Sequence, residues 1–271
     1  MTTSPKPQIL LTNDDGIDSP GLWAAAEALS EIGYVWVAAP REQSSGAGRS
    51  MPSTSDGRIT PQLLTVHGKD WTVYAVGGTP AQTVQHAILE IMGGPPALVV
   101  SGINYGLNLG NGITVSGTVG AAMEAASHGI PALAVSLETA KEYHLSYSRE
   151  IDFRPAAYFT KYFAERLLNG MPDPEVQVLK IEVPVEASAD TPWEIARLAS
   201  TRYYLPDPPI RGNLSDPGAM GYLLESNLNL FPEDSDVFVV LAKKKVAVTP
   251  LTLDMTAPVD FRKLKQDLNS R

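Results

Sequence analysis

Short apolar runs alternate with helical segments along this 271-residue chain, and that alternation limits its possible folds more than any other feature. The first unit consists of an apolar strand at 9–12, a helix that starts at Pro20 and closes near Gly33, and a second strand at 34–39. Because so few residues connect these strands, we expect them to be parallel, with a right-handed crossover. The same pattern predicts strands at 71–76, 97–101, 132–136 and 176–183, and helices at 79–91, 118–128 and 155–168.

This alternation is typical of an α/β fold, with a Rossmann-like, mostly parallel sheet covered by helices on both faces. From about residue 186 the pattern changes. Residues 205–220 are rich in proline, glycine and aspartate, 237–248 predicts a β-hairpin around three consecutive lysines, and 260–268 favours a terminal helix. The 205–220 segment and the expected hairpin are long and poor in core residues, so we expect them to reach a neighbouring copy of the chain.

Charge and composition exclude several classes of function. The chain carries 21 lysine and arginine residues against 30 aspartate and glutamate residues, a formal net charge of −9. This balance argues against duplex nucleic acid as a partner, because affinity for a polyanion depends on clustered cations. The absence of cysteine excludes disulfides, thiolate catalysis and cysteine-bound metals. A short polar start and the lack of any run of about 20 apolar residues indicate neither a signal peptide nor a membrane span, so we expect a cytoplasmic protein.

The first strand ends in an acidic turn, Asn13 to Gly16, at the edge where open α/β sheets place their ligands. The adjacent carboxylates of Asp14 and Asp15 repel each other there unless a proton or a cation neutralises them. A bound divalent metal ion is the simplest way to neutralise the two charges. The alternative is a tight turn whose carboxylates are solvated, and these residues alone leave both interpretations open.

Two glycine-rich loops are expected at the same edge of the sheet. Residues 99–110 pass from a buried strand into a loop in which Asn104 offers a neutral amide oxygen to a hard cation. In residues 115–122, Ser116 or Thr118 caps a helix whose first amides are suited to phosphate. Each loop also has an ordinary explanation, because asparagine and glycine permit positive φ and most helix caps bind no ligand.

Several separate strings of this chain together resemble the SurE family, the survival protein E nucleotidases. They occur in the family's order and span most of the chain, which makes the match far more specific than any single loop. The strings are Leu10–Gly16 (LLTNDDG), Ala39–Pro40 (AP), Gln43–Gly46 (QSSG), Gly78–Ala81 (GTPA), Val100–Gly110 (VSGINYGLNLG), Ser116–Val119 (SGTV) and Thr249–Leu251 (TPL).

The resemblance implies a Rossmann-like fold and a divalent-metal-dependent enzyme that hydrolyses nucleoside 5′- and 3′-monophosphates to nucleoside and phosphate. It also implies homodimers or homotetramers with exchanged C-terminal segments. On this basis we expect residues 1–271 to form a single α/β domain, with a core at about 1–185 and a protruding hairpin and exchange segment at about 186–271.

The resemblance further implies one Mg²⁺ or Mn²⁺ ion per subunit. Its protein ligands fall on Asp14, Asp15, Asn104 and, counting from Pro40, Ser45. Asp14, Asp15 and Asn104 then form the catalytic group, with Asp14 as our choice of general base. The substrate phosphate is expected near Asn13, Ser116, Gly117 and Thr118.

Residues 44–57 are dense in serine and glycine and form either a mobile loop or a binding loop. We expect the nucleoside to lie over this loop, near Tyr105. The chain departs from the family pattern at Gln82 and Thr83, which replace an aspartate and a cysteine, and at Thr252, which replaces a frequent histidine. These departures touch no expected metal ligand but leave the substrate preference and the C-terminal exchange open.

The four histidines, at 67, 86, 128 and 144, match no motif of the family, and we expect His86 and His128 on a helix surface or in packing. Two other functions compete with a nucleotidase. A binding protein with the same fold would bind nucleotide without releasing phosphate. A nucleoside hydrolase would release free base, but its Asp-x-Asp-Pro-Gly-x-Asp-Asp motif is absent. A dinucleotide-binding dehydrogenase is disfavoured because no Gly-x-Gly-x-x-Gly follows the first strand.

Overall fold

The computed structural model describes residues 5–66, 68–144, 146–171 and 173–270, and within them the main sheet has nine strands in the order β3-β4-β2-β1-β5-β6-β7-β11-β8. β3 (Ile59–Val66) is antiparallel to β4, and β11 (Val246–Leu251) is antiparallel to β7 and parallel to the short β8 (Trp193–Ile195). The expected mostly parallel α/β sheet is confirmed by the six central strands, β1 (Gln8–Thr12), β2 (Tyr34–Pro40), β4 (Lys69–Val76), β5 (Leu98–Tyr105), β6 (Ala132–Leu137) and β7 (Val178–Val183).

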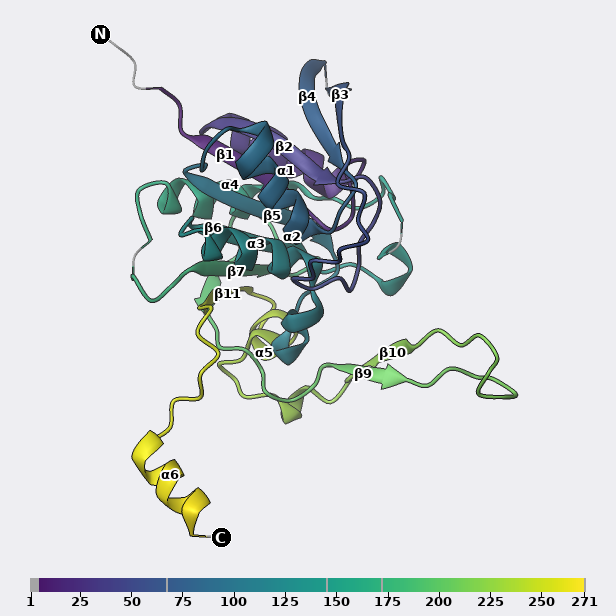
Figure 1. The fold of residues 1–271 in the computed structure, drawn as a ribbon, viewed down its shortest axis with the longest axis vertical. Coiled ribbons are helices and arrows are strands. Elements are labelled where there is room, and N and C mark those ends of the chain that lie inside the picture. The colour runs from purple at the N-terminus through teal and green to yellow at the C-terminus, as the bar shows by residue number, and fades with distance from the viewer. Residues whose placement is uncertain (1–4, 67, 145, 172, 271) are drawn as a thin grey trace.

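Helices cover both faces of this sheet (Figure 1). α1 (Pro20–Ser30) and α4 (Arg154–Leu167) pack on one face, and α2 (Pro80–His86) and α3 (Gly117–Ser127) pack on the other. The helix predicted at 79–91 is confirmed, with its second half in a π-helical turn, η1 (Ala87–Ile91). Short 3₁₀ turns lie at η2 (Gly110–Val115), η3 (Lys141–Tyr143) and η4 (Leu228–Leu230).

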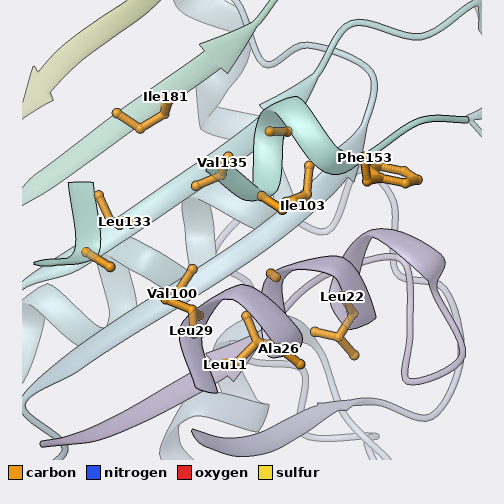
Figure 2. Close-up of a cluster of buried hydrophobic side chains, with 14 of the residues drawn as sticks. Leu11, Leu22, Ala26, Leu29, Val100, Ile103, Leu133, Val135, Phe153 and Ile181 are labelled. Carbon is orange, nitrogen blue, oxygen red and sulfur yellow. The ribbon is translucent and has the colours of Figure 1, made fainter. Parts of the chain in front are cut away.

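The sheet divides the core into two layers, because successive residues of a strand point to opposite faces. On β1, Ile9 and Leu11 join the cluster under α1 and α4, whereas Leu10 joins the cluster under α2 and α3. Burial of each such side chain contributes roughly 1.5–3 kcal/mol relative to leaving it in water. Burial on both faces therefore fixes β1, at whose carboxyl end the acidic turn begins. Figure 2 shows part of the first layer, with Leu22, Ala26 and Leu29 of α1 beside Leu11 and Val100.

The hairpin predicted at 237–248 is wrong. Residues Asp236–Leu241 form α5, and after a turn at the lysines the chain enters β11 of the main sheet. The run of β-branched residues suggested strands. Instead, Ser235 caps the helix by accepting a hydrogen bond from the Phe238 amide, and the valines of α5 are buried in a third cluster beside Leu109. A good cap and burial on one face therefore outweigh the local strand propensity.

The hairpin of the C-terminal part lies earlier in the chain. β9 (Tyr204–Asp207) and β10 (Gly221–Leu224) pair antiparallel as a separate two-stranded sheet, and we call residues 204–224 the arm. The predicted terminal helix is confirmed as α6 (Phe261–Asn269), and we call residues 252–270 the tail. In Figure 1 the arm and the tail extend away from the main sheet in different directions. Among the described residues, no helix combines the length and the apolar character needed to cross a membrane.

Candidate active site

The turn that follows β1 is closed by the side chain of Asn13. Its amide nitrogen donates to the Gly16 carbonyl at 3.0 Å, and its amide oxygen accepts from the Gly16 backbone amide at 3.1 Å. Asn13 is fully buried. Both polar groups of Asn13 thus hold the turn that presents the two carboxylates, so its contacts support a positioning role rather than contact of its side chain with phosphate.

Asp14 points at the first turn of α3. Its Oδ1 accepts a hydrogen bond from the Thr118 hydroxyl at 2.6 Å. A Cβ atom on Gly117 would lie 2.6 Å from the Asp14 Cβ, an approach that only glycine allows. Burial raises the pKa of Asp14, and the Thr118 hydroxyl and nearby backbone amides oppose that rise. The first turn of α3 therefore binds the side chain of Asp14.

Ser116 caps α3 and is also buried. Its hydroxyl accepts a hydrogen bond from the Val119 amide at 3.1 Å, which confirms it as the N-cap residue. The hydroxyls of Ser116 and Thr118 are thus both engaged within the protein. Contact of Ser116, Gly117 and Thr118 with a phosphate stays a prediction.

Asp15 is held by three segments that lie far apart in the sequence. Its Oδ1 accepts from Nε2 of Gln43 at 3.2 Å, and its Oδ2 accepts from the Tyr105 amide at 3.3 Å. Its backbone carbonyl accepts from the Tyr147 hydroxyl at 2.9 Å. Burial and, next, the charge of Asp14 raise the pKa of Asp15 well above its usual range.

The two carboxylates have no cationic partner among the described residues. Asp14 is 5% and Asp15 is 2% exposed, and no lysine, arginine or histidine of the described residues forms an ion pair with either or lowers its pKa. Leaving such a pair buried and charged is costly. A hard divalent cation fits these oxygens. Because the described ranges contain no cluster of three or more histidine, cysteine, aspartate or glutamate residues, its other protein ligands would be neutral oxygens.

Asn104 supplies such an oxygen. β5 bulges between Ser101 and Asn104, where its register against β6 shifts. The Asn104 side-chain nitrogen donates to the Gly106 carbonyl at 2.7 Å and to the Tyr105 carbonyl at 3.3 Å, so that, among the residues described, its Oδ1 has no hydrogen-bond partner. The Tyr105 amide contacts Asp15, and Asn104 is therefore placed beside the acidic turn.

The loop at 44–57 begins against this turn. The Ser44 amide donates to the Asp14 carbonyl at 2.7 Å, and Ser45 follows as an exposed residue. Further along, the Arg49 guanidinium forms an ion pair of 2.7 Å with the buried carboxylate of Glu124 on α3. These contacts tie the loop to the helix and to the acidic turn. The ligand role of Ser45 stays a prediction.

Gln82 holds the second half of the same loop. Its Oε1 accepts from the Thr79 amide at 3.1 Å and from the Ser55 hydroxyl at 2.6 Å, and its Nε2 donates to the Pro52 carbonyl at 2.9 Å. The Thr79 hydroxyl accepts from the Gln82 amide in return, which completes a capping box at the start of α2. This departure from the family pattern therefore has a structural role. Thr83 is buried, and its hydroxyl has no partner among the described residues.

Two cavities lie near the acidic turn. The larger of the two is not the better candidate for the substrate site. A cavity of about 930 Å³ lies between α1, β3 and the 147–154 segment. A smaller cavity of about 380 Å³ is lined by Arg41–Ser44, Thr54–Asp56 and Val76–Thr79. The smaller cavity includes Gln43, whose Nε2 contacts the Asp15 carboxylate, whereas the larger one includes Tyr147, which contacts only the Asp15 backbone carbonyl. The smaller cavity is therefore the better candidate for the one beside the carboxylates.

The Tyr105 ring does not line either cavity. It is 3% exposed, packs edge-to-face on Phe153 with ring centroids 4.8 Å apart, and donates its hydroxyl to the Ser148 carbonyl at 2.9 Å. The buried ring argues against direct contact between a nucleoside and this side chain, and the placement of the nucleoside near residue 105 stays a prediction. The ring belongs to the core under α1 and α4. The bulge in β5 adds a residue before Tyr105, so its side chain points to this face of the sheet instead of the other.

None of the three described histidines forms an ion pair with Asp14 or Asp15. His86 pairs with Glu90 at 2.6 Å and His128 with Glu124 at 3.4 Å, so both take the expected structural roles. His144 is half-buried against the arm, and burial lowers its pKa. His67 lies outside the described residues.

Sequence reasoning missed the residues that orient Asp15. Gln43 donates both to Asp15 and to the His144 carbonyl, the latter at 2.8 Å, and Tyr147 donates to the Asp15 backbone. Gln43 carried a signal, because it belongs to the string Gln43–Gly46. No sequence signal marked His144 or Tyr147, because both lie more than 100 residues from the segments that they contact.

Known proteins resemble this chain over almost its whole length. A family model described as "Survival protein SurE" matches residues 9–204. A protein named 5′-nucleotidase SurE from Thermococcus gammatolerans is 43% identical over 263 residues, 96% of each chain. A protein of the same name from Methanosarcina mazei is 39% identical over 271 residues, 97% of this chain and 98% of the relative. The crystal structure of the SurE protein from Aquifex aeolicus superposes with a TM-score of 0.72 at 30% identity, covering 97% of this chain and 99% of that one.

Proposed function

This chain belongs to the survival protein SurE family, and from that premise we propose that it is a divalent-metal-dependent phosphomonoesterase of nucleoside 5′- and 3′-monophosphates. The names of the relatives support the 5′-nucleotidase activity, and the resemblance to the family supports the 3′-activity. The observation that carries the proposal is the buried pair Asp14 and Asp15, with no cationic partner among the described residues, beside the unpaired amide oxygen of Asn104.

The proposed metal ligands are Asp14, Asp15, Ser45 and Asn104, which would hold one Mg²⁺ or Mn²⁺ ion per subunit. Such an ion, when bound, activates water and neutralises phosphoryl charge, which contributes several kcal/mol to the lowering of the barrier. Hydrogen bonds fix the orientation of both carboxylates: the Thr118 hydroxyl donates to Asp14, and the Gln43 side-chain amide donates to Asp15. Fixed donors of this kind reduce the reorganisation that the reaction needs.

The remaining roles follow from the position of each group. Asp14 is the proposed general base, because its place at the end of β1 puts its carboxylate at the proposed metal site. The substrate phosphate would lie near the start of α3, at Ser116, Gly117 and Thr118, where the Gly117 and Thr118 amides already face the Asp14 carboxylate. The nucleoside would occupy the 380 Å³ cavity beside Ser44.

A screen of phosphate release on metal-stripped protein tests this function. With AMP, 3′-AMP, GMP and an aryl phosphate as substrates, we expect release only after Mn²⁺ or Mg²⁺ is added. Tight nucleotide binding without release would instead show a binding protein, and release of free base would show a nucleoside hydrolase. The departures from the family pattern at Gln82 and Thr252 do not favour a binding protein, because Gln82 takes part in the capping box of α2 and the Thr252 hydroxyl donates to Gln177 at the start of the tail.

We further propose that the arm and the tail, the protruding parts of residues 186–271, pack on other copies of the chain to form a homodimer or homotetramer. Both carry apolar side chains that this subunit leaves uncovered. On the arm Ile210 is 103% and Leu214 is 92% exposed, and on the tail Phe261 is 62% and Leu268 is 65% exposed. Apolar surface of this extent is typical of an interface.

Light scattering is expected to give the mass of two or four chains. The double substitution Phe261→Asp with Leu268→Asp places charge on one face of α6, because residues seven apart lie on the same side of a helix. It is expected to lower the mass. Lys263→Asp changes charge on the other side of α6 and should leave the assembly intact. A one-chain mass for the wild-type protein at all working concentrations contradicts the proposal.

A further inference from the structure

A cluster of three charged side chains is buried away from the carboxylate site. Lys180 and Glu182 lie on β7, and Asp236 is the first residue of α5. All three side chains are fully buried. The Lys180 Nζ lies 3.3 Å from Oε1 of Glu182 and 3.0 Å from Oδ2 of Asp236. One cation thus faces two carboxylates, an arrangement that costs more than apolar packing in the same place.

Besides bonds to Ser136, Ala199 and Val237, the cluster forms hydrogen bonds to the loop that follows β5. Oε2 of Glu182 accepts from the Asn108 amide at 2.8 Å, and the Lys180 Nζ donates to the Asn108 carbonyl at 2.8 Å. Oδ2 of Asp236 accepts from the Gly110 amide at 2.8 Å. The cluster therefore clamps the backbone of this loop on both sides of Asn108.

The clamped loop in turn orients Asn104. The Asn104 side-chain nitrogen donates to the Gly106 carbonyl at 2.7 Å, and Gly106 lies two residues before Asn108. This bond, with the longer one of 3.3 Å to the Tyr105 carbonyl, determines which way the Asn104 amide faces, and so where its Oδ1 lies. A shift of the loop would move the Gly106 carbonyl and release that amide.

We propose that Glu182, with Lys180, is a positioning residue for the metal site, because it holds the loop whose Gly106 carbonyl orients the Asn104 amide. This inference rests on the proposed function, in which Asn104 is a metal ligand. It accounts for charged groups at 180 and 182 in a strand that is otherwise apolar and buried. Side chains outside the ligand set that orient a ligand typically change metal affinity by about 10–100-fold when removed.

The titration of Glu182 is consistent with a hydrogen-bonding role. Burial raises the pKa of Glu182 to about 7, since Lys180 offsets only part of the cost of burying that carboxylate. The charged and titratable groups around it are Lys180 on its own strand, Asp236 on α5, and Tyr204 of β9, whose hydroxyl donates to the Leu107 carbonyl and whose pKa the Glu182 charge raises. Glu182→Gln imitates the neutral form and keeps an oxygen for the Asn108 amide.

The test compares three variants in metal-free protein. Glu182→Leu removes the acceptor and leaves Lys180 paired with Asp236, so that one cation faces one carboxylate. Glu182→Gln is the conservative rescue. Ile181→Ala is the matched control, because Ile181 is buried on the opposite face of β7 under α4 and contributes only packing. The readouts are amide hydrogen exchange of residues 106–112, Mn²⁺ affinity by calorimetry, and the melting temperature.

We expect Glu182→Leu to speed exchange at Asn108 at least tenfold and to weaken Mn²⁺ binding about tenfold. Glu182→Gln should stay within about threefold of the wild-type protein on both readouts. Ile181→Ala should lower the melting temperature without changing Mn²⁺ affinity. Unchanged exchange at Asn108 in Glu182→Leu overturns the positioning role, as does an equal loss of affinity in Ile181→Ala. A wild-type protein that binds no Mn²⁺ overturns the proposed function instead, and the exchange data still decide whether Glu182 holds the loop.

Discussion

Asp14→Asn is expected to lower the rate of metal-dependent phosphate release about 10³-fold or more, because it removes a negative ligand and the proposed general base together. The fold should persist. Asparagine has nearly the same volume, and its Oδ1 can still accept the Thr118 hydroxyl that contacts Asp14 at 2.6 Å. Initial rates with AMP and saturating Mn²⁺, measured beside a thermal melt, separate loss of chemistry from loss of structure.

Asp18→Asn is the matched control for this substitution. Asp18 lies four residues further along the same segment, is exposed, and lines the larger cavity rather than contacting the carboxylate pair. It should retain wild-type turnover. If Asp14→Asn keeps more than a tenth of wild-type turnover at saturating Mn²⁺, Asp14 has no essential role in the reaction.

The position of the acidic pair was predictable, whereas its surroundings were not. Strand β1 ends where a run of apolar residues stops, so the sheet edge places Asp14 and Asp15 without any knowledge of tertiary contacts. Their partners come from other segments: Gln43 is 28 residues from Asp15, and Tyr147 is 132 residues away. Local patterns carry no information on such pairs. Only the family resemblance marked the Gln43 region in advance.

The fold shows the same division between local and tertiary causes. The helices α2 and α3 were predictable because their caps, Thr79 and Ser116, precede suitable sequences and form the expected bonds. The error at 237–248 arose because a run of valines was weighed without the cap at Ser235. The arm was identified as a segment that leaves the core, but its pairing as β9 and β10 was not.

The metal-free protein is expected to lose stability as the pH rises from about 4 toward neutrality. Burial raises the pKa of Asp14 and Asp15 in the folded state. Between the ordinary aspartate pKa and these raised values, the folded protein therefore holds protons that the unfolded chain has released. The free energy of unfolding falls across this range and levels off above it. Glu182, with its pKa raised to about 7, adds a change of the same sign.

Mn²⁺ should counteract this loss at neutral pH, because it binds the deprotonated carboxylates. At a hundred times its dissociation constant, an ion that binds only the folded state adds about 2.7 kcal/mol of stability, which corresponds to roughly 5–11 °C in melting temperature for a chain of this size. Melts at pH 5 and pH 7.5, with and without Mn²⁺, check both effects. The double substitution Asp14→Asn with Asp15→Asn should remove the Mn²⁺ effect and leave the pH dependence of the other groups, in which the raised pKa of Glu182 and the lowered pKa of His144 act in opposite directions.

The direction of this pH dependence separates the two interpretations of the acidic turn. Solvated carboxylates have ordinary pKa values in both states and make stability independent of pH above about 5. A buried pair without a cationic partner makes the metal-free protein more stable when protonated, and makes a divalent cation a substitute for those protons. A metal-free wild-type protein whose melting temperature relative to the double variant is unchanged between pH 5 and pH 7.5 would therefore show that Asp14 and Asp15 are solvated, and that the observation on which the nucleotidase proposal depends does not hold in solution.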